Sequence, residues 1–335
     1  MPMKPTRDAL EALIAGLNGR LVVTADWLAV IALANHTLLT PVLFATLAHT
    51  GQRDRLPEEV GQYLQFIYRC NRDRNLRLRR QLNEAVAALN QGSVVPVLLK
   101  GAVPLFLSSS GRVPDRIMSD LDLAVETTKE GAARACLAKL GYAEVTVAGG
   151  MARPQDVGLL ELRPYREIDR EPPRLARRHG LRAKIPAPQS RALHWMMHDL
   201  IKEADYWRGR TDFRHLYDLA RLAEQHKLDW AALRTSLPDQ SARNAFDTQL
   251  LALSHFFGVS APAQYVRRPW VRFQHWRRVF PLYHPVLGVP LRLVGNSLWG
   301  MWRLLHGDGL GRRSPLDFGR RATTILLDGD LGSKA

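Results

Sequence analysis

Hydrophobic residues in the first quarter of the chain recur at steps of three and four positions. Leu10, Leu13 and Leu17 show this spacing within residues 8–89, and it is typical of amphipathic helices that pack one side against a core. The pattern ends at residues 91–93, where Gln-Gly-Ser is a turn signal. The sequence therefore predicts a helical N-terminal region.

The middle of the chain changes to short apolar runs of the length of strands. Residues 94–99 are rich in valine and leucine and are broken only by Pro96, and residues 121–125 alternate with a period of two. The predicted strands are residues 94–99, 121–125, 142–147 and 157–162, and the predicted helices among them are residues 102–107 and 128–140.

The second half of the chain is predicted to be mostly helical. Residues 164–190 are rich in Arg and Pro and poorly periodic, which indicates a long loop, whereas residues 191–225 show helical spacing in two parts separated at Gly209. The predicted domains are a helical N-terminal region (1–90), a core that contains the sheet (91–190), a helical C-terminal region (191–306) and a loosely ordered tail (307–335).

Charge is the extreme property of this composition. The formal net charge is +15, with 47 Lys and Arg against 32 Asp and Glu, which favours a polyanionic partner such as nucleic acid, a nucleoside triphosphate or an anionic membrane face. An Arg-rich proteome is the competing explanation. The two cysteines, Cys70 and Cys136, lie too far apart for a metal motif or a disulfide framework, so a cytoplasmic protein is expected.

Two segments bear on targeting and on the membrane. The polar N-terminus runs straight into a helical pattern and is not expected to be a signal peptide. The apolar stretch at residues 286–305 contains Arg292, Asn296 and Arg303, so we do not expect it to span a bilayer. An interfacial helix stays open, and with it a membrane-associated location.

The most informative local pattern is a pair of carboxylates on a predicted strand. Asp120 and Asp122 stand two positions apart, so both side chains lie on the same face of the strand, roughly 7 Å apart along the chain. Two carboxylates at one place call for a cation, and two Mg²⁺ ions held there can bind a triphosphate and stabilise a leaving pyrophosphate. Because the Asp-x-Asp pattern is short, the alternative is that both carboxylates simply face solvent on the strand.

Residues before and after the pair strengthen the metal interpretation. Lys100 and Gly101 follow a strand and precede a helix, a turn whose backbone N–H groups suit phosphate oxygens. Arg116 and Ser119 come just before the pair and could hold a phosphate. Glu161 lies among leucines on a later strand, as Gly-Leu-Leu-Glu-Leu, where an acid either faces solvent or has a buried role.

The order Leu-Lys-Gly, a spacer, and then Arg-x-x-Ser-Asp-x-Asp-Leu resembles the nucleotidyltransferase superfamily that includes DNA polymerase beta. Within it, the chain is similar to the bacterial group called uncharacterised nucleotidyltransferases, over roughly residues 8–225, with residues 98–125 as the specific part. The resemblance implies an α+β fold, with a small mixed sheet of the nucleotidyltransferase type flanked by helices and with helical N- and C-terminal regions. Residues 91–190 would be its catalytic core.

The resemblance also implies roles for individual residues. Gly101 corresponds to the turn glycine that holds the nucleotide phosphates, and Asp120 and Asp122 correspond to the metal ligands. Glu161 is similar to the third carboxylate, although Arg163 and Pro164 stand where the group commonly has a His and an aromatic residue. With a shifted strand register, the third carboxylate would instead be Glu167 or Asp169.

A further block of His, Arg and Asp lies on predicted helices. Helical spacing places His194 and His198 on one face, and likewise Arg214 and Asp218. We interpret the two histidines as residues that pack in the core or between helices, in preference to metal ligands. We interpret Arg214 and Asp218 as an ion pair within one helix, in preference to residues that contact the base or ribose of a nucleotide.

Basic residues concentrate in two segments. Residues 163–191 hold nine Arg and Lys against three acids, and residues 267–313 interleave Arg with aromatic side chains and contain one acid, Asp308. The first segment could receive an anionic acceptor. The second suits single-stranded nucleic acid or an anionic bilayer, or is the outside of a helical domain.

Taken together, the sequence predicts a Mg²⁺-dependent nucleotidyltransferase that uses a nucleoside triphosphate. Its acceptor is left open, with RNA, a phosphorylated small molecule or a peptide as anionic candidates. The alternatives are a catalytically degenerate nucleotide- or RNA-binding protein, and a peripheral membrane protein that docks through its basic aromatic C-terminal region.

Overall fold

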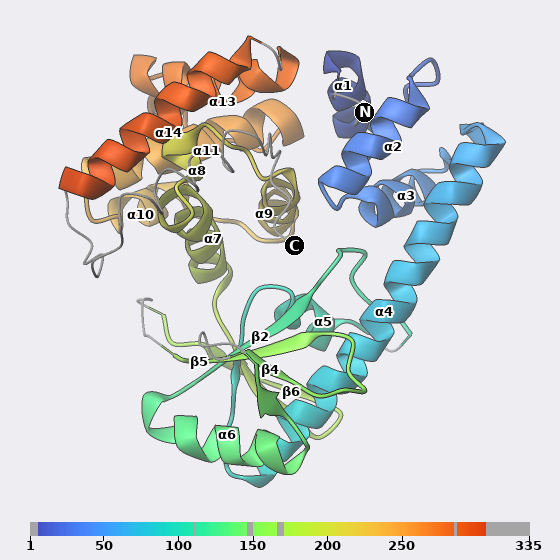
Figure 1. Ribbon diagram of the computed structural model, residues 1–335, viewed down its shortest axis with the longest axis vertical. Helices are drawn as coiled ribbons and strands as arrows, with labels where there is room; N and C mark the ends of the chain where they lie inside the picture. Colours follow the sequence, from blue (N-terminus) through green and yellow to red (C-terminus); the bar gives the residue numbers. More distant parts are fainter. Residues whose placement is uncertain (1–5, 110, 146–149, 166–170, 285–286, 306–335) are drawn as a thin grey trace, which may run out of the picture. The chain divides into compact units, whose positions relative to one another are not determined.

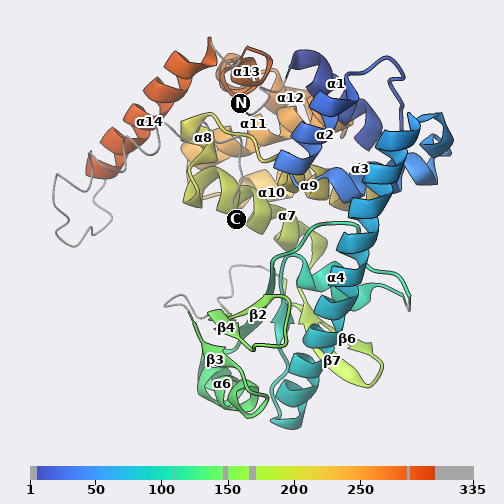
Figure 2. The same ribbon diagram turned by 45° about the vertical axis from the view of Figure 1, so that its right-hand side comes forward.

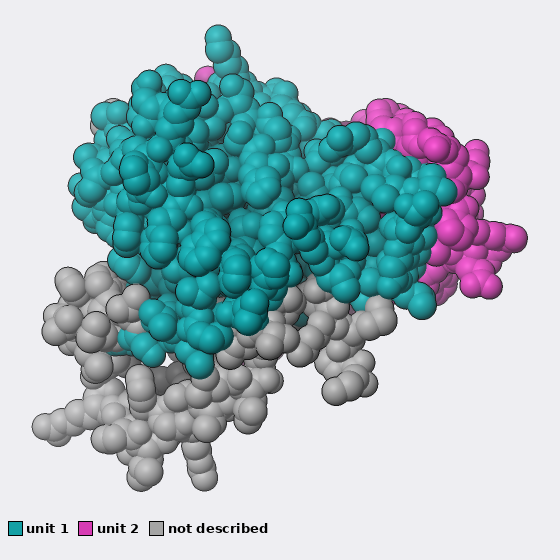
Figure 3. All heavy atoms as spheres, turned by 90° about the horizontal axis from the view of Figure 1, so that it is seen from above, with its two compact units in different colours: residues 1–38, 193–335 teal, residues 39–192 magenta. Residues whose placement is uncertain are grey.

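The computed structural model describes residues 6–109, 111–145, 150–165, 171–284 and 287–305 (Figure 1). These residues divide into two compact units, which Figure 3 colours separately. Unit 1 combines residues 1–38 with residues 193–335, and unit 2 is residues 39–192. The domain limits proposed from the sequence stay a prediction.

Unit 2 contains the sheet and the helices that cover it. Its elements are α3 (Thr40–His49), η1 (Arg53–Arg55), α4 (Glu58–Gln91), β1 (Val97–Leu98), α5 (Ala102–Leu107), β2 (Asp120–Val125), η2 (Thr127–Lys129), α6 (Glu130–Lys139), β3 (Ala143–Glu144), β4 (Gly150–Ala152), β5 (Leu159–Pro164), β6 (Arg174–Arg178) and β7 (Leu181–Ile185).

The sheet is mixed, with the strand order β3-β4-β5-β2-β1-β7-β6. The central strand β2 pairs parallel to β5 and antiparallel to β1, and β1 pairs parallel to β7. The predicted α+β fold with a small mixed sheet and flanking helices is therefore confirmed.

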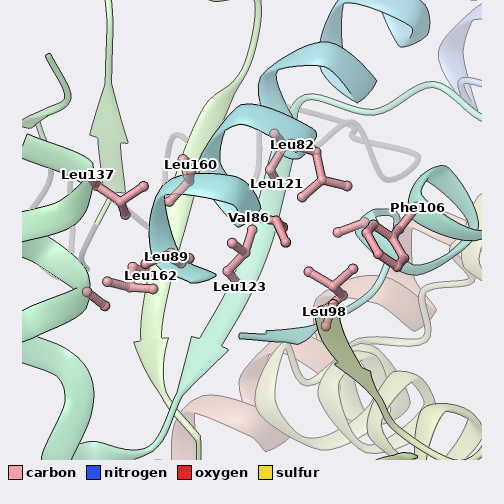
Figure 4. Close-up of a cluster of buried hydrophobic side chains, with 14 of the residues drawn as sticks. Leu82, Val86, Leu89, Leu98, Phe106, Leu121, Leu123, Leu137, Leu160 and Leu162 are labelled. Carbon is pink, nitrogen blue, oxygen red and sulfur yellow. The ribbon is translucent and has the colours of Figure 1, made fainter. Parts of the chain in front are cut away.

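Alternation along β2 separates a core face from a polar face. Leu121, Leu123 and Val125 are fully buried in one cluster with Leu160 and Leu162 of β5. Figure 4 shows this cluster, to which α4 contributes leucines and Val86. Burying each leucine contributes about 2 kcal/mol to folding. Because side chains alternate along a strand, this packing leaves Asp120 and Asp122 on the opposite face.

The prediction of a long loop at residues 164–190 is wrong, because the segment contains two strands. Within it, β6 and β7 form an antiparallel hairpin around His179 and Gly180, both with positive φ (48° and 78°), as a two-residue hairpin turn requires. The hairpin lies against α4 in Figures 1 and 2, and α4 contacts β7. Charged side chains occupy both faces of β6, an edge strand, so no apolar alternation revealed it.

Two other predicted strands differ in extent. The first is limited to Val97–Leu98, because Pro96 lacks the N–H that a ladder needs. The strand predicted at residues 142–147 is confirmed at Ala143–Glu144, and its last two residues lie outside the described part of the chain.

Unit 1 is helical. Its elements are α1 (Arg7–Leu17), α2 (Trp27–His36), α7 (Pro188–Met197, which begins in unit 2), η3 (His198–Lys202), α8 (Asp205–Arg208), α9 (Phe213–Gln225), α10 (Trp230–Thr235), α11 (Gln240–Phe257), α12 (Ala263–Val266), α13 (Pro269–Tyr283) and α14 (Gly288–Leu305). Among the described residues, none of the helices is both long and apolar enough to cross a membrane.

Candidate active site

The polar face of the sheet brings two of the predicted carboxylates together. β2 and β5 run parallel in a register that sets Asp122 directly beside Glu161. Arg163, two positions along β5, reaches the same place: its guanidinium contacts Glu161 and lies 3.9 Å from Asp122 Oδ1. Arg163 shares the face of Glu161 because side chains alternate along β5, and this period-two spacing is the signal in the sequence that would have found it.

Lys100 adds a second cation to Asp122. Its Nζ lies 3.0 Å from Asp122 Oδ1, and the side chains of both residues are shielded, at 19% and 4% exposure. The adjoining backbone holds the strands together, since Leu99 N–H donates to the carbonyl of Asp122 at 3.0 Å. The turn after β1 thus aims Lys100 across the edge of β2.

The turn between β1 and α5 differs from the expected one, in which Gly101 was the central residue. Lys100 is the residue in the left-handed region, at φ 42°, whereas Gly101 has φ −66° and is the N-cap of α5. A non-glycine residue pays about 1–2 kcal/mol for that conformation. The space at Gly101 is tight, because a Cβ there would lie 2.7 Å from Met118 Sδ and 3.2 Å from a guanidinium nitrogen of Arg116, so a larger residue would displace these side chains.

The loop before β2 is fixed by side chains of α4. Asn75 Nδ2 donates to the carbonyls of Pro114 and Arg116, both at 2.8 Å, and Asn71 Nδ2 donates to that of Asp115 at 2.9 Å. An arginine of α4 takes part as well: Arg74 donates to the carbonyl of Met118 at 3.2 Å. These bonds position the loop that carries Arg116.

The remaining predicted site residues lie at the margin of this group. Arg116 is half-buried, and its guanidinium lies 3.2 Å from the position that a Cβ on Gly101 would occupy. Asp120 is half-buried and shares the face of Asp122 by alternation. Ser119 is exposed, and its carbonyl accepts from Leu159 N–H at 3.4 Å. The alternatives Glu167 and Asp169 lie outside the described residues.

Asp122 is electrostatically unusual for a buried group. The residue is only 3% exposed, and its Oδ1 has no hydrogen-bond donor among the described residues, because the nearby Lys100 Nζ does not approach in hydrogen-bonding geometry. The ammonium of Lys100, 3.0 Å away, is the cation that offsets the cost of burying this carboxylate. The described side chains contain no cluster of three His, Cys, Asp or Glu within reach of one metal ion, so the structure shows a pair of carboxylates with two basic partners.

Asp199 is one of three buried aspartates among the described residues of unit 1, and the sequence had not singled it out. Asp199 lies in η3, a π-helical turn, and its oxygens are 2.7 Å from His215 Nδ1 and 3.3 Å from His198 Nδ1. Burial raises the pKa of Asp199, but the hydrogen bonds from both histidines outweigh it and hold that pKa below its usual range. His198 thus packs within the helical unit, as interpreted.

His215 is the partner that this arrangement perturbs. Burial alone would lower its pKa, yet the hydrogen bond with Asp199 and the charges of Asp199 and Asp212 raise the pKa of His215 overall. Aspartate and histidine lie 16 positions apart, on different helical segments. Helical spacing links only near neighbours, so it gave no signal for this pair.

Comparison with known proteins identifies a family. A family model described as "uncharacterised nucleotidyltransferase" matches residues 24–258, more than two thirds of the chain. A solved structure of the antibiotic-resistance factor ANT(2'')-Ia is similar at 18% identity with a TM-score of 0.33, over 53% of this chain and 95% of that one. No curated protein matches the chain.

Proposed function

Because the chain belongs to the uncharacterised nucleotidyltransferases, we propose that it moves a nucleoside monophosphate from a nucleoside triphosphate to an acceptor, with Mg²⁺ as the cofactor. The observation that supports the site most strongly is the register of β2 and β5, which sets Asp122 beside Glu161, together with the buried Asp122 oxygen that lacks a donor. An all-oxygen set on two adjacent strands is the kind of donor group that Mg²⁺ prefers.

In this proposal the residues divide into two groups. Asp120, Asp122 and Glu161 would hold the metal, which would supply positive charge to the triphosphate and the leaving pyrophosphate. In the structure the strand register brings Asp122 and Glu161 together, so Asp120 would complete the set only when the metal binds. The second group, which binds the phosphates, is Lys100, Gly101, Arg116 and Ser119. Lys100 suits this role because its ammonium already lies at the carboxylates, on a flexible stem that can turn to a phosphate oxygen.

The reaction itself needs little covalent chemistry from the chain. An acceptor oxygen attacks the α-phosphorus, the bond to the bridging oxygen of the β-phosphate breaks, and pyrophosphate leaves while the acceptor loses its proton. Binding both reactants in line and neutralising the charge that develops would supply most of the rate enhancement. The rigid loop held by α4 provides such positioning for Arg116.

The direct test is transfer of label from nucleoside triphosphates carrying ³²P at the α-position. Each of the four triphosphates would be incubated with Mg²⁺, the protein and a small-molecule and RNA extract that supplies the acceptor. We expect the wild type to convert one triphosphate into a new labelled product, and Asp122→Asn to abolish it. Asp54→Asn, a matched change at an exposed position of η1, should keep full activity.

Two results would contradict the proposal. Label transfer that survives in Asp122→Asn would remove the carboxylates from the mechanism. Tight binding of triphosphate or RNA by the wild type, independent of Mg²⁺ and without any product, would instead identify a degenerate binding protein.

One surface feature favours a second function, contact with an anionic membrane. On α13, Trp270, Phe273 and Trp276 are each 47% exposed, and successive ring centroids lie 5.6 and 5.9 Å apart. No Asp or Glu occurs from residue 248 to residue 307. Leu293 and Val294 on α14 are exposed as well, at 38% and 56%. Aliphatic side chains gain nothing from stacking on bases, so a lipid surface suits this composition better than RNA.

Vesicle binding tests this second function. We expect the protein to sediment with vesicles of phosphatidylcholine and phosphatidylglycerol at low salt, and to stay in solution with phosphatidylcholine alone. A Phe273→Ser/Trp276→Ser variant should lose binding, while Phe66→Ser, at a more exposed aromatic on α4 (63% against 47%), should retain it. Equal binding by both variants would contradict a docking role for α13.

A further inference from the structure

A small cavity in unit 2 lies apart from the carboxylates. It has a volume of about 150 Å³, and its lining includes Arg79 and Asn83 of α4, Phe106 and Ser108 at the end of α5, and Arg178 and His179 of the hairpin. A single water needs roughly 10–15 Å³ on the same measure, so the space accommodates a group of several heavy atoms. α5 begins beside Lys100 and ends at this cavity, which separates the two places by about 9 Å along its axis.

The two guanidinium groups are held in position by backbone carbonyls. Arg79 Nη1 donates to the carbonyls of Arg112 at 2.7 Å and Ser109 at 3.2 Å. Arg178 Nη1 donates to the carbonyl of Leu107. In each case the bonds use one terminal nitrogen of a group that carries five N–H donors, so donors are left for a ligand.

The charge around the cavity is of a single sign. No carboxylate lines it, and within the described residues neither Arg79 nor Arg178 makes an ion pair with an acid. Elsewhere in the same unit, buried or half-buried arginines such as Arg134 and Arg153 pair with Glu or Asp. Two guanidinium groups without an acidic partner, an imidazole and an amide around one hollow form a donor set suited to an anion.

We propose that this cavity is a second anion site, which binds a terminal phosphate group. A phosphate monoester matches the site because its oxygens can accept from both arginine forks at once, whereas the hydroxyl of Ser108 already donates to the carbonyl of Pro104 at 2.6 Å. The buried ring of Phe106, at 2% exposure, forms an apolar wall that restricts access by water. The site is independent of the metal-binding carboxylates and does not rest on the proposed transfer reaction.

Calorimetric titration with inorganic phosphate, in the full chain at physiological ionic strength, tests the site. We expect saturable binding by the wild type and at least a 10-fold loss of affinity in Arg178→Ala. The matched control is Arg177→Ala, which removes the same charge from the exposed neighbouring position and should change the affinity less than 2-fold. Asp122→Asn should leave phosphate binding unchanged, which separates this site from the carboxylates.

A second variant guards against a loss of folding. Arg178→Ala also removes the bond to Leu107, so its melting temperature must match that of the wild type. His179→Asn keeps a residue that tolerates the positive φ of the turn and should weaken phosphate binding about 3-fold. Equal losses in Arg177→Ala and Arg178→Ala, no saturable binding by the wild type, or sensitivity to Asp122→Asn alone would overturn the proposal.

Discussion

Two of the four buried aspartates among the described residues, Asp199 and Asp122, have opposite surroundings. Asp199 in unit 1 accepts hydrogen bonds from two histidines, His198 and His215. Asp122 in unit 2 has Lys100 and Arg163 nearby, yet its buried Oδ1 lacks a hydrogen-bond donor among the described residues. Both side chains are almost inaccessible, at 8% and 4% exposure.

The difference indicates what each carboxylate is for. A buried charge whose oxygens are bonded to fixed partners stabilises the packing around it and has little capacity for a ligand. A buried carboxylate that is met by an ion pair alone, without a fixed hydrogen-bond donor, can exchange that pair for a metal ion or a substrate. We therefore propose that Asp199 stabilises unit 1 and that Asp122 takes part in the reaction.

The largest expected effect is on catalysis by Asp122→Asn. Asparagine keeps the shape but not the charge, so transition-state stabilisation should fall by about 4 kcal/mol, or roughly 10³-fold in rate. The free energy of unfolding should change by less than about 1 kcal/mol, because a costly buried charge is removed as well. Steady-state kinetics and urea denaturation of the same preparation measure both.

Asp199→Ala should show the reverse profile. Removing it leaves His215 buried without its acceptor, and we expect a loss of about 3 kcal/mol in unfolding free energy. Nucleotide affinity of the folded protein, measured by titration well below its melting temperature, should stay within 2-fold of wild type. A stable Asp199→Ala protein that cannot transfer nucleotide would reverse the assignment of the two aspartates.

Glu161→Gln should have an intermediate effect. Its carboxylate is already neutralised by Arg163 and is more exposed than that of Asp122, at 19% against 4%. We expect about a 10²-fold loss of transfer rate, close to 2.7 kcal/mol, and a weaker response to Mg²⁺ concentration. Glu126→Gln, a matched change of an exposed residue paired with Lys184, should be indistinguishable from wild type.

The smallest effect is the pH dependence of stability around Asp199. The raised pKa of His215 gives stability that is present below its ordinary value of 6.5 and is lost as the pH rises through the folded value. The lowered pKa of Asp199 gives stability that is present above 3.8 and is lost as the pH falls through the folded value. Both contributions are present between about pH 4 and 6.5.

Urea denaturation across this range measures the effect. The difference in unfolding free energy between wild type and Asp199→Ala should be greatest inside the window from pH 4 to 6.5 and should shrink above it. Asp212 and Arg214 also face His215, since Asp212 raises its pKa and Arg214 lowers it. The same pH profile measured for Asp212→Asn gives the contribution of Asp212 to the unfolding free energy. A difference that grows steadily toward alkaline pH would contradict the assignment.

The sequence predicted the local features of the candidate site well. Period-two spacing sufficed to place Asp120 and Asp122 opposite the leucines of β2, and the turn signal at Gly101 located the end of β1. These features depend only on residues that are close along the chain, so the sequence alone was enough to predict them.

Features that depend on pairing between distant segments could not be predicted in the same way. The register that sets Glu161 beside Asp122 joins strands that start 39 positions apart, and the link between Asp199 and His215 spans two helical segments. The basic hairpin of β6 and β7 was missed because an edge strand need not alternate. Lys100 in the left-handed region was also unexpected, since glycine is the usual residue there.

The most direct test of the central claim is metal binding at Asp122, which needs no acceptor. Titration of Mn²⁺, as a spectroscopic substitute for Mg²⁺, would be followed by electron paramagnetic resonance with each nucleoside triphosphate present, for wild type and Asp122→Asn. We predict that wild type binds the metal together with at least one triphosphate and that Asp122→Asn loses this binding. Equal metal and nucleotide binding by the two proteins would contradict the assignment of the buried carboxylate to the reaction.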